Sequence, residues 1–397
     1  MKSEIHQLKN SLMNSGKYVF SQLVEILPKR SFDRMVDKYQ GNKYVKHFSC
    51  WNQLLCMVFG QLTHRESLRD LLVVIRAHSS KSYHLGLGRK VSRSNLAKAN
   101  ENRDFRIFEE YAYLLIDLAR KKRSEKDFAI RGKIYAFDST TIDLCLSIFW
   151  WAKFKKIKAG IKVHTLYDVK TQIPSFLHIT AAAYNDMNAM DHIPYEPGAY
   201  YIFDRAYIDY TRLHHITEHS AYFVIRSKTN LKFRRIYSNQ IDQSSGIVYD
   251  QIGKLAGRKG SKGYPDKLRR IKFFDDETNR IFIFLTNNIE LKATEIAMLY
   301  KQRWMVELFF KWIKQHLKVK TFWGTSENAV RIQIYCAIIT YCMVAIAEEN
   351  LKLDRTTYEV LQILGISLLD KTPVQELFSS GVPPMQDDNS QLEINFL

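Results

Sequence analysis

Two aspartates each end a short apolar run, a position from which a carboxylate can do chemistry. Asp138 follows the run at 134–137, and Asp204 follows the run at 200–203. Both runs read as buried strands, and open α/β sheets bind ligands at the carboxyl ends of their strands. One such acid alone is most simply a turn cap or an ion-pair partner, because a buried carboxylate is costly without one. Two acids in matching positions favour a bound cation.

A glutamate in a helical segment supplies a third carboxylate. Polar residues recur there at steps of three and four, which places on one face of a helix Tyr300, Arg303, Glu307, Lys311 and Lys314. The simplest explanation is an amphipathic helix with ion pairs such as Glu307–Lys311. The alternative is a catalytic face that offers one carboxylate among several cations.

Together the three acids make an all-oxygen ligand set, the type that Mg²⁺ prefers. Two such ions close together can activate a water or a 3′-hydroxyl and stabilise the leaving oxygen of a phosphodiester. Arg303, Lys311 and Lys314 would hold DNA phosphates beside them, and Tyr300 would add a hydroxyl or a stacking face. The hypothesis is a metal-dependent phosphodiester chemistry carried by the three acids.

Other residues of the same chemical types are more simply explained by structure. His164 and His178 lie on a predicted hairpin, where histidines are usually structural, and Asp143 reads as a solvent-facing or salt-bridged acid rather than a substitute ligand. A local group resembles a metal cluster but also reads as a loop and a helix start: Asp186, Asp191 and His192. Trp150 and Trp151 precede lysines and could stack on DNA, although packing against the sheet is the simpler interpretation.

The elements that must position the acids read as a mixed α/β core. Alternation and apolar runs predict strands at 133–144, 160–168, 173–184, 199–207, 221–227 and 281–287, the second and third forming a hairpin. A short helix at 210–219 would act as a crossover. A long helix at 291–317 carries Glu307, and an apolar helix follows at 328–351.

A basic segment at 228–280 interrupts this core. It is rich in Lys and Arg, and part of it reads as a loop because of Gly257, Gly260 and Gly263. We expect a β-rich insertion here with a surface suited to DNA. The chain is expected to end in a helical segment and, from Pro383, a polar and acidic tail.

The first 125 residues read as helical. Ser49 can cap a helix through Leu62, and Ser67 a second helix through about Ala77. Apolar residues at helical spacing predict a third helix at 105–120. The basic segment 84–100 ends in a short predicted helix, and it is either a helix-turn-helix reading head or an ordinary basic loop.

Composition limits the classes of function. The chain has 397 residues with 59 Lys and Arg against 41 Asp and Glu, a net charge of +18 that points to a polyanionic partner. No apolar leader is evident at the start, and the longest apolar run suits a core helix better than a membrane span. The five cysteines form no CxxC pair, so we expect neither zinc nor disulfides and a reducing, cytoplasmic setting.

Three motifs resemble those of the insertion-sequence-4 family of DDE transposases. The first acidic motif is matched by FDSTTIDL with Asp138, and the second by FDRAYID with Asp204 and Tyr207. The family's C-terminal signature Y-x2-R-x3-E-x6-K is matched at every position by Tyr300, Arg303, Glu307 and Lys314. The motifs occur in order on the expected element types, and the resemblance covers about residues 130–350.

The resemblance implies an α/β protein with an RNase H-like mixed-sheet catalytic core. The implied segments are a helical N-terminal DNA-binding domain (1–125), the first part of the core (126–227), a β-rich insertion (228–280), the second part of the core with the catalytic helix (281–352), and a C-terminal helical segment with a polar tail (353–397). The N-terminal domain would recognise terminal inverted repeats, and a homodimer would pair two DNA ends.

The resemblance also implies a mechanism. Asp138, Asp204 and Glu307 would hold two Mg²⁺ ions, for which Mn²⁺ can substitute, and Tyr300, Arg303 and Lys314 would grip DNA near the scissile phosphate. The enzyme would cut at transposon ends and join the freed 3′-hydroxyl to target DNA. Some relatives form a DNA hairpin on the way and flip a base with an aromatic residue, for which the candidates here are Phe233, Tyr237, Tyr249 and Tyr264.

Two other classes remain open. A non-catalytic DNA-binding protein, such as an inactive transposase remnant or a regulator, explains the charge but not three acids in matching contexts. A metal-dependent nuclease without strand transfer explains the acids and differs only in forming no joined products. A protein of the membrane surface is the weakest alternative, because no basic amphipathic anchor is evident.

Overall fold

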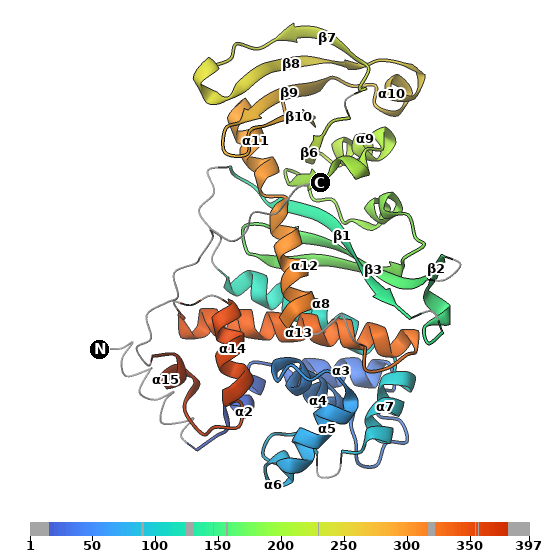
Figure 1. The fold of residues 1–397 in the computed structure, drawn as a ribbon, viewed down its shortest axis with the longest axis vertical. Helices are drawn as coiled ribbons and strands as arrows, with labels where there is room; N and C mark the ends of the chain where they lie inside the picture. The colour runs from blue at the N-terminus through green and yellow to red at the C-terminus, as the bar shows by residue number, and fades with distance from the viewer. Residues whose placement is uncertain are drawn as a thin grey trace.

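A mixed sheet runs through the molecule, and helices cover both of its faces (Figure 1). The computed structural model describes residues 16–88, 91–123, 130–145, 147–155, 158–228, 230–316, 322–353, 355 and 357–379. Helix α12 (Trp304–His316) runs across the sheet towards α13 (Glu327–Leu351), which lies between the sheet and the N-terminal helices (Figure 1).

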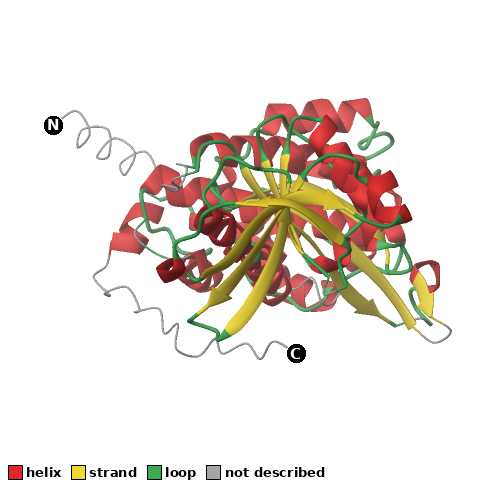
Figure 2. Cartoon of the chain, turned by 90° about the horizontal axis from the view of Figure 1, so that it is seen from above, coloured by secondary structure: helices red, strands yellow, loops and turns green. Residues whose placement is uncertain are grey.

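Ten strands within the described residues form one sheet. In chain order they are β1 (Ile134–Leu144), β2 (Lys153–Lys155), β3 (Lys158–Asp168), β4 (Ile173–Ala181), β5 (Tyr200–Phe203), β6 (Tyr222–Arg226), β7 (Phe233–Ser238), β8 (Ile247–Leu255), β9 (Leu268–Asp275) and β10 (Arg280–Thr286). Their spatial order is β2-β3-β1-β5-β6-β10-β9-β8-β7, with β4 paired to β3. Seen from above, the strands fan out with helices around them (Figure 2). The predicted mixed α/β class and the β3–β4 hairpin are confirmed.

The strands β1, β5 and β6 pair in parallel at the centre, and the other pairings are antiparallel. The basic insertion extends this sheet, because its strand β9 pairs with β10 from Arg280 to Thr286, the whole length of β10. A buried ion pair joins β8 to β9, with Asp250 Oδ2 2.7 Å from Arg269 Nη2. The insertion and the core therefore share one continuous hydrogen-bonded sheet.

Side chains of the central strands alternate between two buried layers. The layer on the side of α12 and α13 takes Ile134, Ala136, Tyr200 and Ile202. The opposite layer, with the 3₁₀ helix η2 (Asp186–His192) and α9 (Tyr210–Glu218), takes Tyr135, Phe137, Tyr201 and Phe203. Because the alternation has a period of two, the next residues, Asp138 and Asp204, face the side of α12.

The N-terminal region is helical as predicted. Its helices are α2 (Val19–Val24), α3 (Lys29–Lys38), α4 (Cys50–Leu62), α5 (Leu68–Ala77), α6 (Ser79–Ser82), α7 (Arg93–Asn102) and α8 (Arg106–Lys122). The side chain of Ser49 accepts a hydrogen bond from the amide of Asn52, and that of Ser67 accepts one from the amide of Asp70. Both predicted caps are thus confirmed. Residues 89–90 of the expected reading head lie outside the described residues.

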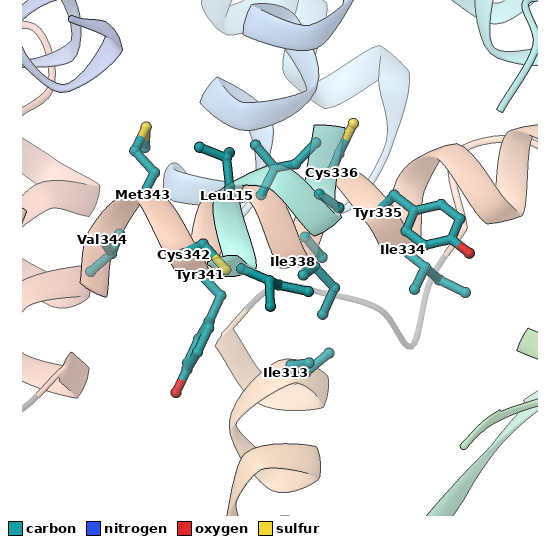
Figure 3. Packing of buried hydrophobic residues seen from close by; sticks show 14 of the residues in the cluster. Leu115, Ile313, Ile334, Tyr335, Cys336, Ile338, Tyr341, Cys342, Met343 and Val344 are labelled. Carbon is teal, nitrogen blue, oxygen red and sulfur yellow. The ribbon is translucent and has the colours of Figure 1, made fainter. Parts of the chain in front are cut away.

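Helix α13 joins the N-terminal helices to the sheet. Figure 3 shows Leu115 of α8 and Ile313 of α12 reaching α13 from different sides. All of these side chains belong to one core that extends from Val19 to Phe378. By length and composition α13 could cross a membrane, but 94% of its most apolar stretch is buried inside the protein, as in the core helix predicted.

The long helix expected at 291–317 is two helices, and residue 317 lies outside the described residues. Helix α11 (Ala293–Lys301) ends before α12 begins. At the junction the amide of Arg303 bonds to the carbonyl of Tyr300 at 3.0 Å, and that of Met305 bonds to Gln302 at 3.1 Å. These three-residue steps tighten the backbone into turns. Arg303 therefore lies at a junction between two helices.

The remaining elements are short or terminal. They are α10 (Arg258–Gly263), α14 (Thr357–Ser367), α15 (Val374–Ser379) and the 3₁₀ helices η1 (Trp150–Ala152), η3 (Arg205–Tyr207) and η4 (Gln243–Ser245). The acidic tail expected from Pro383 lies outside the described residues.

Candidate active site

Asp138 and Asp204 lie at the same level of two adjacent parallel strands. The parallel pairing of β1 and β5 ends at Phe137↔Phe203, and each aspartate is the next residue. Asp204 directly follows β5, as expected. The expectation of a strand end is wrong for Asp138, because β1 continues to pair with β3 as far as Leu144↔Ala159.

The junction between α11 and α12 brings Arg303 and Glu307 to these aspartates. Arg303 Nη1 lies 2.5 Å from Glu307 Oε1 and 3.5 Å from Asp138 Oδ2. The hydroxyl of Tyr300 donates a hydrogen bond to Asp204 Oδ1 at 3.4 Å. The structure thus gathers the three acids around a single helix junction, although 66 and 103 positions separate them along the chain.

The surroundings of Asp138 perturb its pKa. Burial raises the pKa of Asp138 to about 6, and the nearby charges of Glu307 and Asp204 push this pKa in the same direction. The amide of Ser139, which donates to Asp138 Oδ1 at 2.8 Å, and the Arg303 guanidinium oppose the rise. A carboxylate in this state gains from any further positive charge placed beside it.

Two tyrosines frame the aspartates. Burial raises the pKa of Tyr300 to about 12, with Arg303 opposing the rise and Asp204 adding to it. The hydroxyl of Tyr207 donates to Asp138 Oδ1 at 3.3 Å, and burial raises its pKa as well. Both phenols therefore stay protonated and act as hydrogen-bond donors to the carboxylates.

The two lysines of the predicted stripe differ in position. Lys314 Nζ donates to the carbonyl of Thr141 on β1 at 3.0 Å, which fixes it against the sheet near the acids. Lys311 is exposed on α12. Glu307 pairs with Arg303. The helix face thus carries a carboxylate, a half-buried lysine and an exposed lysine.

A polar network behind Asp138 escaped the sequence analysis. Ser139 Oγ donates to Asp186 Oδ1 at 2.8 Å, and Lys162 Nζ lies 3.0 Å from Asp186 Oδ2. His164 is fully buried nearby, with its Nδ1 3.7 Å from Asp186 Oδ1. Burial lowers the pKa of His164 to about 4, with Asp186 opposing the change. No spacing signal links these residues, because the sheet and η2 bring them together.

The other sequence candidates lie elsewhere. Asp143 is exposed, and its odd offset from Asp138 turns it to the opposite face of β1. Asp191 pairs with Arg212 at 2.7 Å. Trp150 is 77% exposed, so its expected packing against the sheet is wrong.

Among the aromatic residues of the insertion, exposure separates two candidates for base flipping. Tyr264 is 1% exposed and packs in the second core, where a base cannot reach it. Tyr237 is 47% exposed on β7, the last strand of the sheet. Burial thus favours Tyr237 over Tyr264.

The donor set fits a hard divalent cation in its chemistry. The three acids offer only carboxylate oxygens, the ligands that Mg²⁺ prefers. Within the described part of the chain, no three His, Cys, Asp or Glu side chains form a compact metal-binding group. The Arg303 guanidinium lies between Asp138 and Glu307 and places a positive charge beside both carboxylates.

Comparison with protein families identifies two regions. Residues 131–343 match the transposase DDE domain, more than half of the chain. Residues 15–88 match a domain of unknown function, DUF4372. The first match contains the three acids together with Tyr300, Arg303 and Lys314.

Individual relatives carry transposase names. The chain is 37% identical over 277 residues to "Putative transposase y4zB" of Sinorhizobium fredii, covering 68% of this chain and 75% of that protein. It is 29% identical over 251 residues to "Probable transposase for insertion sequence element IS5377" of Geobacillus stearothermophilus (63% and 66%). It is 25% identical over 295 residues to "Putative transposase for insertion sequence element IS4SA" of Synechocystis (72% and 80%).

Among solved structures, a piggyBac transposase synaptic complex with hairpin DNA matches at a TM-score of 0.44 and 10% identity, covering 94% of this chain and 86% of that one. That similarity is too low for a residue-by-residue correspondence. The domain match and the identity to the Sinorhizobium protein are sufficient by themselves: this chain belongs to the DDE transposase family.

Proposed function

We propose that this chain is the cut-and-paste transposase of an insertion sequence of the IS4 family. It would cleave DNA at the ends of its element and join the freed 3′-hydroxyls to target DNA. The observation that carries the proposal is the gathering of Asp138, Asp204 and Glu307 around the α11–α12 junction. The alternatives of a non-catalytic DNA-binding protein and of a plain nuclease are outcomes of the test below.

The three acids would together hold the divalent cations, Mg²⁺ or Mn²⁺. When bound, such ions supply an activated oxygen nucleophile and stabilise the leaving oxygen of a phosphodiester. The raised pKa of Asp138, with two neighbouring carboxylates adding to it, supports this role because cations relieve such repulsion.

The cations of the helix junction would hold DNA beside the acids. The guanidinium of Arg303 is already held beside Asp138 and Glu307, and it would bind a phosphate oxygen of DNA placed at these acids. Lys311 and Lys314 on α12 would contact phosphates on either side. Tyr300, protonated at neutral pH, would orient Asp204 by its hydrogen bond.

The wider setting follows from the same proposal. Two DNA ends must be brought together for joining, so we propose a homodimer on DNA, acting in the cytoplasm on the nucleoid. The hairpin route remains part of the proposal, with Tyr237 as the preferred aromatic because of its exposure.

The test removes each carboxyl charge without changing its shape. Asp138→Asn, Asp204→Asn and Glu307→Gln should each lower Mg²⁺-dependent cleavage of the element's own end DNA by about 10²–10³-fold, the scale of lost charge stabilisation in active sites. End binding, measured by fluorescence anisotropy, should stay within a few-fold of the unchanged protein.

Asp143→Asn is the matched control, because this acid lies on the same strand but on the other face. It should cleave normally. Normal cleavage by any of the three test variants would reject that acid as a ligand. If the unchanged protein cleaves end DNA but forms no joined products, it is a nuclease. If the unchanged protein binds end DNA and never cleaves it, it is a non-catalytic DNA-binding protein.

A further inference from the structure

A concave surface lies in the N-terminal region, outside the α/β core that carries the acids. Its walls are the segment 39–48 and α7, and its volume is about 650 Å³. We call it the loop–α7 groove. It is lined by Tyr39, Gln40, Gly41, Lys43, Tyr44, Val45, Lys46, His47, Phe48, Asn95, Lys98, Ala99, Asn102, Arg103 and Asp104.

The charge of the groove is positive. Lys43 and Lys46 are exposed on the segment, and Lys98 is exposed opposite them on α7. Asp104 is the one carboxylate in the described lining, and it is bound by the guanidinium of Arg106, with Nη2 2.6 Å from Oδ2. The surface therefore offers cationic side chains from two sides and little negative charge to offset them.

One aromatic ring stands out from this basic surface. The side chain of Tyr44 is 92% exposed, and its backbone has a φ of +62°, a conformation that non-glycine residues seldom adopt. Lys43 Nζ lies 5.5 Å from the centre of the ring. An exposed aromatic held in an uncommon backbone conformation beside lysines is the arrangement used to stack on bases or sugars.

The groove is held in shape before any ligand arrives. The amide of Gly41 donates to the carbonyl of Val36 at 2.9 Å, and Asn42 Oδ1 accepts from the amide of Cys50 at 2.8 Å. Arg103 ties the other end by donating to the carbonyl of Phe48 and, at 2.9 Å, to Gln53 Oε1. Binding to this surface therefore requires little further ordering of the backbone, and the loss of conformational entropy is small.

Helix α7 presents a polar face to the groove. Asn95, Lys98 and Asn102 recur at steps of three and four, so they lie on one side of the helix. Asparagine amides can donate to and accept from the edge of adenine, and lysine binds phosphate. An α-helix fits the major groove of B-DNA.

We propose that the loop–α7 groove binds duplex DNA, with Lys43, Lys46 and Lys98 on phosphates, Tyr44 against the sugars and bases, and α7 reading base edges through Asn95 and Asn102. This assignment rests on the proposed transposase function and names the surface that would recognise the ends of the element. It gives a binding role to residues 15–88, which match a domain of unknown function.

The test measures binding of the full chain to two labelled duplexes by fluorescence anisotropy over a range of salt. One duplex carries the terminal sequence of the encoding element, and the other is a scrambled duplex of equal length. The triple variant Lys43→Ala/Lys46→Ala/Lys98→Ala should bind both at least about tenfold more weakly. For this variant, the slope of log affinity against log salt concentration should be shallower by roughly 2–3. Each lost phosphate contact accounts for about 0.9 of this change.

A matched triple variant controls for the change of net charge. Lys29→Ala/Lys121→Ala/Lys371→Ala removes three exposed lysines outside the groove and should bind within about threefold of the unchanged chain. Equal losses in both triples would overturn the proposal in favour of a general charge effect. Normal binding by the groove triple would overturn it directly.

The double variant Asn95→Ala/Asn102→Ala separates base reading from phosphate binding. It should lower affinity for the end duplex while leaving the scrambled duplex unchanged, at about 1–3 kcal/mol of discrimination for each base contact removed. Tyr44→Ala should weaken both duplexes, as loss of a stacking surface does. Equal effects of the asparagine variant on both duplexes would overturn the reading role.

Two further outcomes keep the proposals apart. Glu307→Gln should bind the end duplex normally, so a failed active site and a failed groove give different results. If vesicles with anionic headgroups bind the chain more tightly than DNA does, and the groove triple removes that binding, the surface is a membrane site and the DNA assignment fails. Melting curves show whether each variant is folded, and Lys43→Glu serves as a second charge probe.

Discussion

Arg303 determines the charge state of the candidate active site. Burial would lower the pKa of this guanidinium, but Glu307, Tyr300 and Asp138 hold it above its usual range. It therefore stays charged and neutralises part of the negative charge of the acids. The sequence indicated the three acids, Tyr300 and Arg303, because each stands in a short motif that can be recognised from neighbouring residues alone. It could not indicate that Arg303 bridges two acids, because this depends on the break between two helices.

The network behind Asp138 provides a test at the scale of one residue. His164 is fully buried and its pKa is lowered to about 4, whereas an unfolded chain binds this proton near pH 6.5. The contribution of the neutral His164 side chain to the free energy of unfolding is fully present above about pH 6.5. It is lost as the pH falls towards 4. Between pH 7 and pH 5, His164 should lower the free energy of unfolding by about 2 kcal/mol. We therefore expect the His164→Gln variant to lose about 2 kcal/mol less than the unchanged protein over this interval.

Urea unfolding at both pH values measures this difference. His215→Gln is the control, because this histidine is half exposed. Its loss of stability over the same interval should match that of the unchanged protein. Parallel pH curves for His164→Gln and the unchanged protein would contradict the assignment of a buried neutral imidazole.

At the scale of elements, local signals proved reliable and distant pairings did not. Ser49 and Ser67 mark their helices because capping acts within a few residues. The junction at Arg303 was missed because no Gly or Pro marks it. The joining of the insertion to the core sheet through β9 and β10 was also missed, because pairing partners are chosen by packing rather than by local sequence.

Helix α4 contains a glycine whose role is close packing. A Cβ on Gly60 would lie 2.4 Å from Cη2 of the buried Trp323 ring. Alanine would favour the helix by about 1 kcal/mol, but overpacking a core costs about 1–3 kcal/mol. We expect Gly60→Ala to lower the free energy of unfolding by up to about 2 kcal/mol, measured by urea titration.

A smaller ring should relieve the clash. Trp323→Phe removes the outer atoms that approach Gly60, so the double variant Gly60→Ala/Trp323→Phe should lose less stability than the two single variants together. Strict additivity would show that the ring moves aside and that the glycine is not needed there.

At the scale of the molecule, one hydrophobic core joins the N-terminal helices to the α/β sheet, although the sequence predicted a domain boundary at residue 125. Helix α13 contacts both α4 and α8 of the N-terminal region, and its buried side chains belong to the same core as those of α12. The division at residue 125 stays a prediction about function. The packing indicates that the N-terminal helices and the sheet stabilise each other.

Shared stability is measurable by hydrogen exchange in increasing urea. Amides in peptides from α4 and β5 should exchange through openings of the same free energy. The Ile338→Ala variant in α13 should lower both free energies of opening by about 2–5 kcal/mol. Ile366→Ala, at a side chain that is 86% exposed, should change neither. Earlier opening of α4 alone would mean that the N-terminal region unfolds as a separate unit.

The place of α13 in the chain has a consequence for synthesis on the ribosome. The N-terminal helices are translated first, but the helix that covers them ends at Leu351, roughly 230 residues after α8 ends. At about 5–20 residues per second this delay is on the order of 10–45 s. Nascent chains would expose apolar helix faces during that time, so a premature stop before α13 should yield a product for chaperones and proteases rather than a shortened DNA-binding protein.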